Sequence, residues 1–328
     1  MNNNGKRPRR VVQLSDAATY VLPYLYPAEL SAISLTCKTL HLIAKSVTAA
    51  RSSDACRNTE KVPIPFINST ADSHPYTYFI YTPTQVLSFS NDPPRQPWGS
   101  CSLEQPDLGL ILPPTLEDGS RCECERCDSD SVGCPCSRQN FPGLIWECGS
   151  GCMCDLGCAN RVSQRGISIR LKIVRSQWKG WGLHADQFIP SGEFICEYAG
   201  ELLTTKEARK RQQTYDKLKS TNKHTSALLV VREHLPSGNT CMRINIDATR
   251  IGNVARFINH SCDGGNLSTV LVRSSGALLP RVCFFASQDI LKDQELTFSY
   301  GDSGSNPNGS KCFCGTGCCT GIMPSELT

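Results

Sequence analysis

The sequence contains no long apolar run and no segment typical of secretion. No stretch approaches the ~20 apolar residues that a membrane-spanning helix needs, so we expect no membrane association. Residues 1–10 are polar and basic with no apolar segment behind them, which argues against a secretory signal. Charge of one sign is also scarce, because 34 Lys and Arg against 30 Asp and Glu leave only +4, too little for a protein that coats nucleic acid. With 328 residues, the chain can bury one large core or two smaller ones without disulfides.

Cysteine, in contrast, is abundant and unevenly placed. The chain has 20 cysteines, of which nine lie in residues 122–158, four in residues 312–319, and seven are scattered. Without a secretory signal we expect a reducing compartment, where clustered cysteines bind metal more often than they form disulfides. The first cluster consists of Cys122, Cys124, Cys127, Cys134, Cys136, Cys148, Cys152, Cys154 and Cys158.

The size of this cluster suits three zinc ions. Three tetrahedral ions need twelve ligand bonds, and nine thiolates supply twelve if three of them each bridge two ions. C-x-C pairs make good neighbouring ligands but would strain a disulfide. Such a cluster is structural, because full thiolate coordination leaves no open position for chemistry. The alternatives are a disulfide framework, or two four-cysteine zinc sites with a spare thiol. The excess negative charge could be partly offset by Arg121, Arg126, Arg138 and Arg161.

The first 61 residues are predicted to be a basic tail and a small helical appendage. The tail carries Lys6-Arg7-Pro8-Arg9-Arg10, which fits either a nuclear localisation signal or a solvated disordered end. Apolar residues recur at roughly helical spacing over 14–50, and Pro23 and Pro27 divide that stretch, so the pattern predicts two short helices. Residues 27–38 faintly resemble an F-box, which would recruit a partner protein; the other interpretation is a plain helical appendage.

The rest of the chain is predicted to be mainly β. Residues 62–120 are rich in Pro, Ser and Thr, with a strand-like run over 76–81. Short β-type runs then alternate with glycine turns, which indicates several small sheets rather than one parallel sheet. One helix is expected over 204–219, where Thr204 and Glu207 form a capping box and the Lys/Arg-rich face is solvated. The expected later strands are 167–171, 194–198, 228–231 and 282–285.

Three short segments carry the chemistry. The first is KGWGL at 179–183, where two glycines let the backbone approach a ligand closely. The second is RFINHSC at 256–262, preceded by Asp247-Ala248 and Gly252-Asn253, and the third is ELTFSYG at 295–301. Each alone could be a core strand with a turn. Their order, after the nine-cysteine cluster and before the C-x-C-x4-C of 312–319, is specific.

This arrangement resembles the SET-domain protein-lysine methyltransferases of the suppressor-of-variegation type, in a short plant-type form with pre-SET, SET and post-SET parts. The resemblance is strong over about 120–323 and weaker back to about 62. It implies a mainly β SET fold of small sheets, in which the C-terminal segment threads under the Asn259-His260 loop as a pseudoknot. The implied domains are the appendage at 1–61, pre-SET at 62–164, SET at 165–302 and post-SET at 308–324.

The resemblance also assigns the donor site and a fourth zinc site. The methyl donor would be S-adenosylmethionine. Lys179-Gly180-Trp181 match the segment whose backbone holds its methionine end, and Asn259-His260 match the pair that binds its amino group and adenine. Arg256-Phe257 lead into that pocket, which Tyr300 also borders. A fourth zinc ion would be held by Cys262, Cys312, Cys314 and Cys319, which leaves Cys318 as a spare thiol that could exchange with Cys319.

The acceptor implied by the resemblance is a histone-tail lysine, most often lysine nine of histone H3, on the tail or in a nucleosome in the nucleus. Tyr300 matches the catalytic tyrosine, and Tyr198 matches a second tyrosine lining the lysine channel. A narrow apolar channel beside a positive sulfur would lower the pKa of a lysine from ~10.4. Tyr300 either orients the amine or helps to remove its proton. Phe298 occupies the product-specificity position, and because it lacks a hydroxyl it predicts di- or trimethylation.

Two departures from the family pattern are visible. Ala227 stands where the family often has a tyrosine of the lysine pocket. Residues 263–266 replace the usual proline-asparagine with a turn expected to be looser and longer. The rival functions are a catalytically weak chromatin-binding scaffold and methylation of a non-histone protein. No sequence-specific DNA binding is expected.

Overall fold

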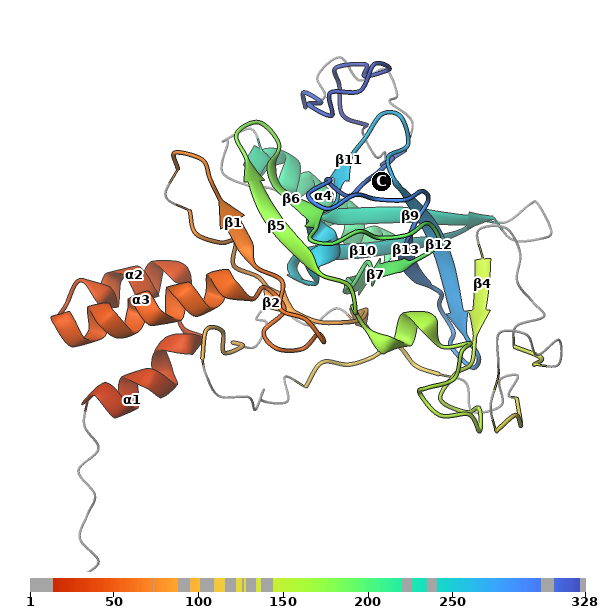
Figure 1. Cartoon of the computed structure of the whole chain (residues 1–328), viewed down its shortest axis with the longest axis horizontal. Helices are drawn as coiled ribbons and strands as arrows, with labels where there is room; N and C mark the ends of the chain where they lie inside the picture. The colour runs from red at the N-terminus through yellow and green to blue at the C-terminus, as the bar shows by residue number, and fades with distance from the viewer. Residues whose placement is uncertain are drawn as a thin grey trace, which may run out of the picture.

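In the described part of the chain, short strands form four small sheets rather than one large sheet, as the alternation of β-type runs and turns predicts (Figure 1). The computed structural model describes residues 14–72, 74–87, 95–100, 109–115, 122–125, 127, 134–136, 144–219, 226–234, 241–301 and 310–324. The basic tail at 1–10 lies outside the described residues. Among the described residues, no helix combines the length and apolar character that crossing a membrane requires.

Two of the sheets pair strands of the predicted pre-SET lead-in with strands of the predicted SET part. The first has the order β1-β5-β6, with β1 parallel to β5. The second has the order β2-β10-β8-β3, with β9 antiparallel to β10. The strands are β1 (Phe66–Asn68), β2 (Ile80–Tyr81), β3 (Val86–Leu87), β5 (Leu171–Ser176), β6 (Gly180–Ala185), β8 (Gly200–Leu203), β9 (Leu228–His234) and β10 (Cys241–Gly252).

The third sheet has the order β4-β12-β13-β7, and the fourth is the parallel pair β11-β14. Residues far apart in the chain meet in both, because β4 precedes the SET strands by many residues and β14 follows them. The strands are β4 (Leu144–Glu147), β7 (Phe194–Glu197), β11 (Asn259–His260), β12 (Leu267–Ser274), β13 (Arg281–Ala286) and β14 (Thr297–Phe298); the short 3-10 helices η3 (Val162–Arg165) and η4 (Val254–Phe257) connect neighbouring strands.

The strand predictions are confirmed in position but not in every boundary. The runs at 194–198, 228–231 and 282–285 lie in β7, β9 and β13. The run at 76–81 contributes only Ile80–Tyr81, and the run at 167–171 joins β5 only at its last residue, Leu171. Ile167 and Ile169 are buried in the core although they precede the strand, so their apolar alternation reports burial and not sheet pairing.

The N-terminal appendage has three α-helices, where the sequence predicted two. They are α1 (Leu14–Val21), α2 (Pro27–Ser34) and α3 (Lys38–Ser53), with the 3-10 turn η1 (Leu22–Tyr24) between the first two. Pro27 begins α2, and the Glu29 carboxylate accepts the Tyr26 amide at 2.8 Å. The missed break is at Cys37, whose extended backbone separates α2 from α3 without any proline or glycine to mark it.

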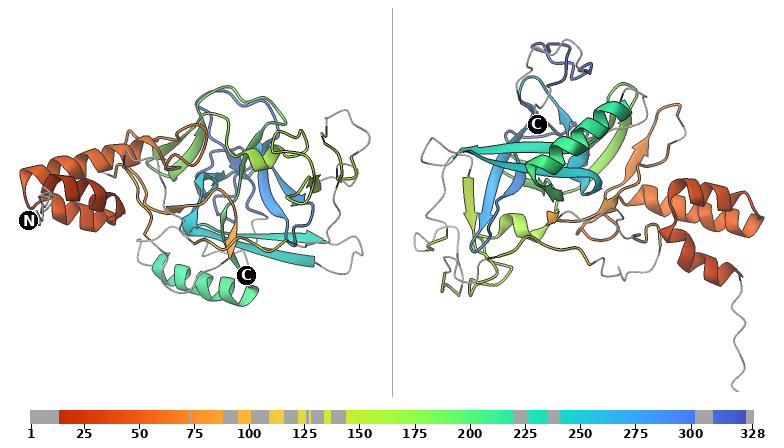
Figure 2. Two further views of the ribbon diagram at one scale, coloured as in Figure 1. Left: turned by 90° about the horizontal axis from the view of Figure 1, so that it is seen from below. Right: turned by 180° about the vertical axis from the view of Figure 1, so that it is seen from behind.

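The appendage lies at one end of the molecule, opposite the β4 end (Figures 1 and 2). It is attached through Arg51 on α3, which is fully buried. The Arg51 guanidinium donates to the carbonyl oxygens of Trp98, Pro23 and Leu25 at 2.8, 3.0 and 2.8 Å. It also donates to the Tyr76 hydroxyl at 2.9 Å. One buried cation therefore connects the helices to the lead-in segment beneath them.

The helix predicted over 204–219 is confirmed as α4 (Thr205–Lys219), and the Glu207 amide donates to the Thr204 hydroxyl at 3.2 Å. Its basic face is not wholly solvated. Arg211 faces the sheet and pairs with Glu201 and Asp247, each at 2.7 Å. Tyr215 donates to the same Asp247 carboxylate at 2.6 Å. Because two carboxylates compensate its charge, this arginine can be largely buried.

Replacing Arg51 by methionine tests how the appendage is held. The substitution keeps an apolar stem but removes the guanidinium donor from three carbonyls, of which that of Pro23 still accepts the Trp98 amide, so we expect about 2 to 3 kcal/mol of destabilisation. Hydrogen exchange should show faster exchange of amides in residues 22–53, with little change in β10. Lys45→Met, at an exposed position of the same helix, is the control. Equal protection in both variants would contradict this role of Arg51.

Candidate active site and metal centres

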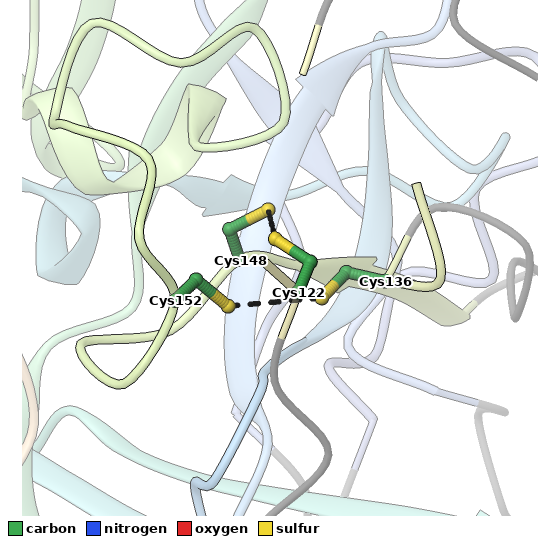
Figure 3. A group of neighbouring side chains, drawn as sticks. All are labelled: Cys122, Cys136, Cys148 and Cys152. Carbon is green, nitrogen blue, oxygen red and sulfur yellow. Dashed lines mark hydrogen bonds between the residues drawn. The ribbon is translucent and has the colours of Figure 1, made fainter. Parts of the chain in front are cut away.

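Eight of the nine predicted cluster cysteines are buried together, and the ninth, Cys124, packs against them. Three sulfurs, those of Cys122, Cys127 and Cys148, lie 3.7 to 3.8 Å from one another. Figure 3 shows one group of four, in which the Cys122 and Cys136 side chains point toward Cys148 and Cys152. The three groups able to hold a metal ion are Cys122/136/148/152, Cys122/127/134/148 and Cys127/148/154/158.

The overlap of these groups has the pattern that three bridging thiolates would produce. Cys122 and Cys127 each occur in two groups and Cys148 in all three, whereas the other cysteines occur once. If Cys124 takes the place of Cys148 in the group Cys122/127/134/148, each zinc ion has two bridging and two terminal sulfurs. Two separate four-cysteine sites would not need shared sulfurs, and the described cysteines are all free thiols. The arrangement therefore favours the three-zinc cluster over both alternatives.

The donor set also fits zinc chemically. Burial raises the pKa of the Cys148 thiol, so a sulfur in this position becomes a thiolate only where a cation binds it. Arg161 supplies part of the expected compensation, since its Nε and Nη2 atoms lie 3.4 Å from Cys154 Sγ. The other three arginines named for this role lie outside the described residues.

The predicted fourth zinc site is also assembled. The sulfurs of Cys262, Cys312, Cys314 and Cys319 form one group able to hold a metal ion. Cys262 and Cys312 are 3.8 Å apart although 50 residues separate them in the chain. Cys318, predicted as a spare thiol, is exposed and is not part of this group.

The nine-cysteine cluster is joined to the SET strands by buried polar groups. The Cys136 thiol lies 2.9 Å from the Ser275 hydroxyl, and the Ser275 amide donates to the Glu147 carbonyl. Arg281 then bridges the Glu147 and Glu197 carboxylates at 2.9 and 3.3 Å. Burial raises the pKa of the Glu197 carboxyl, and Arg281 opposes that shift. Glu197 directly precedes Tyr198, so this chain of contacts reaches the predicted lysine channel.

The predicted donor-binding segments meet at Glu295. This residue begins the ELTFSYG motif but was not among the predicted site residues. Its carboxylate accepts the Lys179 ammonium at 2.7 Å and the Asn259 side-chain amide at 2.8 Å. Asn259 also donates to the Trp181 carbonyl at 3.4 Å. Opposite charges side by side suit an amino-acid end, which has one carboxylate and one ammonium group of its own.

A further observation fits a bound ligand at this corner. A side chain at Gly182 would meet Glu295 Oε1 at 2.7 Å and Asn259 Nδ2 at 3.0 Å, so glycine keeps this corner open. The residues of the corner therefore fit an amino-acid-bearing donor. Arg256 stacks against the Phe79 and Phe257 rings, and the groups that raise its pKa against burial are those of Tyr198, Asp247 and Tyr215, not Glu295.

His260 has a structural role that the resemblance did not imply. The Tyr300 amide donates to its Nδ1 atom at 3.1 Å, so the neutral ring carries its proton on Nε2. Nε2 lies 3.2 Å from the sulfur of Cys262. Burial lowers the pKa of His260, in keeping with a neutral ring. The ring therefore connects Tyr300 to a predicted zinc ligand.

Tyr198, Tyr300 and Phe298 come together as the sequence analysis expects. The Phe298 ring lies 4.8 Å from the Tyr300 ring and 4.7 Å from Phe284, which in turn contacts Tyr198. The Tyr300 hydroxyl donates to the Ile258 carbonyl at 2.6 Å, and the Tyr198 hydroxyl donates to the Ala227 carbonyl at 2.9 Å. Each tyrosine oxygen is thereby left as an acceptor.

Ala227 contributes its main chain where the family often has an aromatic side chain. Its carbonyl accepts both the Tyr198 hydroxyl and the Ala248 amide, and its own amide donates to the Thr249 hydroxyl. The backbone needed to position Tyr198 is therefore intact. Only the aromatic side chain that the family often has at this position is absent.

The turn after Cys262 is ordered, not loose as predicted. Asp263 accepts the Ser261 hydroxyl at 2.6 Å and the Gly265 amide at 3.0 Å, and these hydrogen bonds hold the pKa of Asp263 below its usual value. Gly265 has φ +76°, and a side chain there would lie 2.3 Å from the Thr297 carbonyl. Phe298 pairs with His260 on one side and Gly265 on the other, so β14 passes between two parts of this loop. That is the arrangement expected of the threaded C-terminal segment.

Single cysteine substitutions distinguish ligands from the spare thiol. Native mass spectrometry of the intact chain should show four zinc ions, one for each group. Cys319→Ser should reduce this number to three, because serine does not replace a thiolate ligand. Cys318→Ser, one residue away and exposed, should retain all four. Loss of zinc from the Cys318 variant instead would reverse the two assignments.

Comparison with known proteins bears directly on this site. The family described as "SET domain" matches residues 180–301. Histone-lysine N-methyltransferase SUVR3 of Arabidopsis thaliana is 57% identical over 325 residues, covering 95% of this chain and 91% of that protein. Arabidopsis thaliana SUVH6, whose name includes "H3 lysine-9 specific", is 32% identical over 300 residues, covering 81% of this chain and 35% of that protein.

Solved structures of histone-lysine methyltransferases have a similar fold. SUVH6 in complex with SAM has a TM-score of 0.62 and 29% identity, covering 83% of this chain and 55% of that chain. KRYPTONITE in complex with mCHH DNA, an H3(1-15) peptide and SAH has a TM-score of 0.59 and 26% identity, covering 83% of this chain and 53% of that chain. The chain belongs to the SET-domain histone-lysine N-methyltransferases, enzymes that use S-adenosylmethionine as the methyl donor.

Proposed function

We propose that this enzyme methylates lysine nine of histone H3 in the nucleus, that it forms di- or trimethyl-lysine, and that the residues assembled above are its site. The observation that carries the proposal is the meeting of Tyr198, Tyr300 and Phe298 beside the donor-binding segments. The lysine-nine assignment is supported by the name of SUVH6, and binding of a histone tail by the H3 peptide in the KRYPTONITE complex.

The two tyrosines orient the amine rather than remove its proton. Both hydroxyl protons are engaged by main-chain carbonyls, so each oxygen can accept an N–H of the lysine but is not a free base. Accepting the amine protons would aim the remaining lone pair along the channel. Since methyl transfer is an in-line displacement, correct aim supplies much of the rate. The proton must leave to solvent before the transfer, which a low-dielectric channel favours.

The donor would be held by the polar corner around Glu295. When bound, S-adenosylmethionine supplies a methyl group on a positively charged sulfur. The Lys179 ammonium and the Glu295 carboxylate offer charges complementary to its methionine end, and the Asn259 side-chain amide donates to the same carboxylate.

The zinc ions would order the chain without taking part in the reaction. The nine-cysteine cluster would hold the predicted pre-SET part, residues 62–164, against the SET part at 165–302 through Ser275 and Arg281. The fourth ion would hold the post-SET segment, 308–324, beside Tyr300 through Cys262 and His260. Sulfur ligands fill all four positions of each ion, so none remains for substrate.

Recombinant nucleosomes and free histone H3 test the proposal directly. The enzyme is incubated with S-adenosylmethionine, and mass spectrometry identifies the modified lysine and the number of methyl groups. We expect modification of lysine nine, and a drop of about 10²-fold in Tyr300→Phe because the amine loses one of its two acceptors. Tyr20→Phe, at an exposed position on α1, is the control. Modification at another lysine would reject the assignment of lysine nine.

The product prediction has its own variant. Phe298→Tyr places a hydroxyl among Tyr300, Phe284 and the amine, where it can hold a water or hydrogen-bond the lysine. We expect the ratio of monomethyl to higher products to rise about fivefold, since one hydrogen bond is worth roughly 1 kcal/mol. Monomethyl product alone from the unmodified enzyme, at full turnover, would contradict the role given to Phe298.

A further inference from the structure

The positive charge of the chain is concentrated in two segments. Residues 1–10 carry four basic and no acidic residues, and residues 206–223 carry seven basic and two acidic ones. These segments contribute +4 and +5, so with a total of +4 the other 300 residues carry a net −5. The small net charge therefore conceals a strongly basic element, most of which is the helix α4.

The basic residues of α4 divide between two faces. Ala208, Arg211 and Tyr215 face the sheet, and the charge of Arg211 is compensated by Glu201 and Asp247. On the opposite face, Lys206, Arg209 and Lys210 are exposed. Their spacing of three and four residues places them side by side. No carboxylate within the part of the chain that the structure describes lies within 4.0 Å of their charged groups.

This basic face is on the outside of the molecule. Figure 2 shows α4 lying across β9 and β10, with its outer side turned away from the rest of the chain. Three unpaired like charges within one helical turn repel one another and add nothing to the packing of α4, which Ala208 and Tyr215 provide. A polyanion would favour the same arrangement, because each phosphate contact releases condensed counterions.

The strand on which α4 packs also reaches the predicted lysine channel. Asp247, which binds Arg211, precedes Ala248, and the Ala248 amide donates to the Ala227 carbonyl that holds the Tyr198 hydroxyl. Strand β10 therefore contacts both α4 and the predicted channel, and the nucleosome that carries the substrate tail is the polyanion available to the basic face. We propose that Lys206, Arg209 and Lys210 bind the phosphate backbone of duplex DNA beside the histone tail, without reading its sequence. The proposal rests on the proposed function, because it takes a nucleosome as the natural substrate.

Neutralising the face tests the binding. The full-length zinc-loaded triple variant Lys206→Gln, Arg209→Gln, Lys210→Gln should fold normally, since glutamine is as good a helix former as the residues replaced. Its matched control is Lys38→Gln, Lys45→Gln, Arg170→Gln, which removes the same charges at exposed positions away from α4. Binding to a 30-base-pair duplex is titrated at several potassium chloride concentrations. The slope of log affinity against log salt should become shallower by about 2 to 3 in the α4 variant only, and affinity near 0.1 M salt should fall at least about tenfold.

Methylation of two substrates, one with DNA and one without, then shows whether the charges on α4 act through DNA. The α4 variant should methylate free H3 peptide at the rate of the unmodified enzyme, and nucleosomes at least about fivefold more slowly at low substrate concentration. An unchanged salt slope, or the same reduction in the control variant, would overturn the proposal. Slower methylation of nucleosomes with unchanged DNA binding would also overturn it, in favour of an acidic protein surface. If the unmodified enzyme methylates neither substrate, the proposed function fails. The DNA titration still shows in that case whether Lys206, Arg209 and Lys210 bind DNA.

Discussion

In residues 122–158, bonds between thiolates and metal take the place of a hydrophobic core. The buried cluster of this region in the described structure consists of cysteines alone. Sulfurs as close as 3.7 Å could not all be thiolates unless cations lay between them, so the segment depends on zinc for its order. The cluster in turn places Glu147 at the end of β4, where the strand pairs with β12 and joins the SET sheets. The shape of this end of the molecule therefore follows from metal coordination.

A buried ion-pair network connects the cysteine cluster to the predicted active site. Arg281 lies between Glu147, next to the cysteine cluster, and Glu197, next to Tyr198. Two buried carboxylates must share a cation, because either one alone would be costly to bury. Asn253 adds to the same junction by donating to the Glu197 carbonyl at 2.7 Å and accepting the Ala255 amide. The position of Tyr198, the residue predicted to line the lysine channel, is thus set by buried polar groups as well as by apolar packing.

The opposite side of the site is organised in the same way. His260 receives the Tyr300 amide on one nitrogen and faces Cys262 with the other, so the fourth metal group and the proposed catalytic tyrosine share one ring. Glu295 fixes Lys179, which directly precedes β6, and Asn259 of β11. The contacts of Tyr300 with His260, and of Glu295 with Lys179 and Asn259, join segments that are distant in the chain, and each has one partner next to β14. The passage of the C-terminal segment through the 259–266 loop brings these partners together.

Local patterns in the sequence were sufficient for part of this description. The count of clustered cysteines predicted the three-zinc cluster, since ligand number and tetrahedral coordination limit the ways nine sulfurs can serve three ions. The fourth metal group was implied only by the family resemblance, because Cys262 lies 50 residues before its partner Cys312. The capping box predicted the start of α4, and the order of three motifs predicted the family. The helix break at Cys37 was missed, because an extended backbone at a cysteine leaves no turn residue to mark it. The run at 167–171 was misjudged as a strand because burial and sheet pairing produce the same apolar alternation.

By itself, the sequence determined the residues available for chemistry: the thiols, the two tyrosines, Phe298 and the donor-binding segments. Only the tertiary structure decided which of them touch. Three features depend on contacts between residues that are distant in the chain. Arg211 turns inward while Lys206, Arg209 and Lys210 remain outside, and Ala227 holds Tyr198 through its carbonyl. Glu295 and Arg281 each connect separate segments. The physical reason is that a buried charge or hydroxyl finds its partner by proximity in space, which no local pattern of residues encodes.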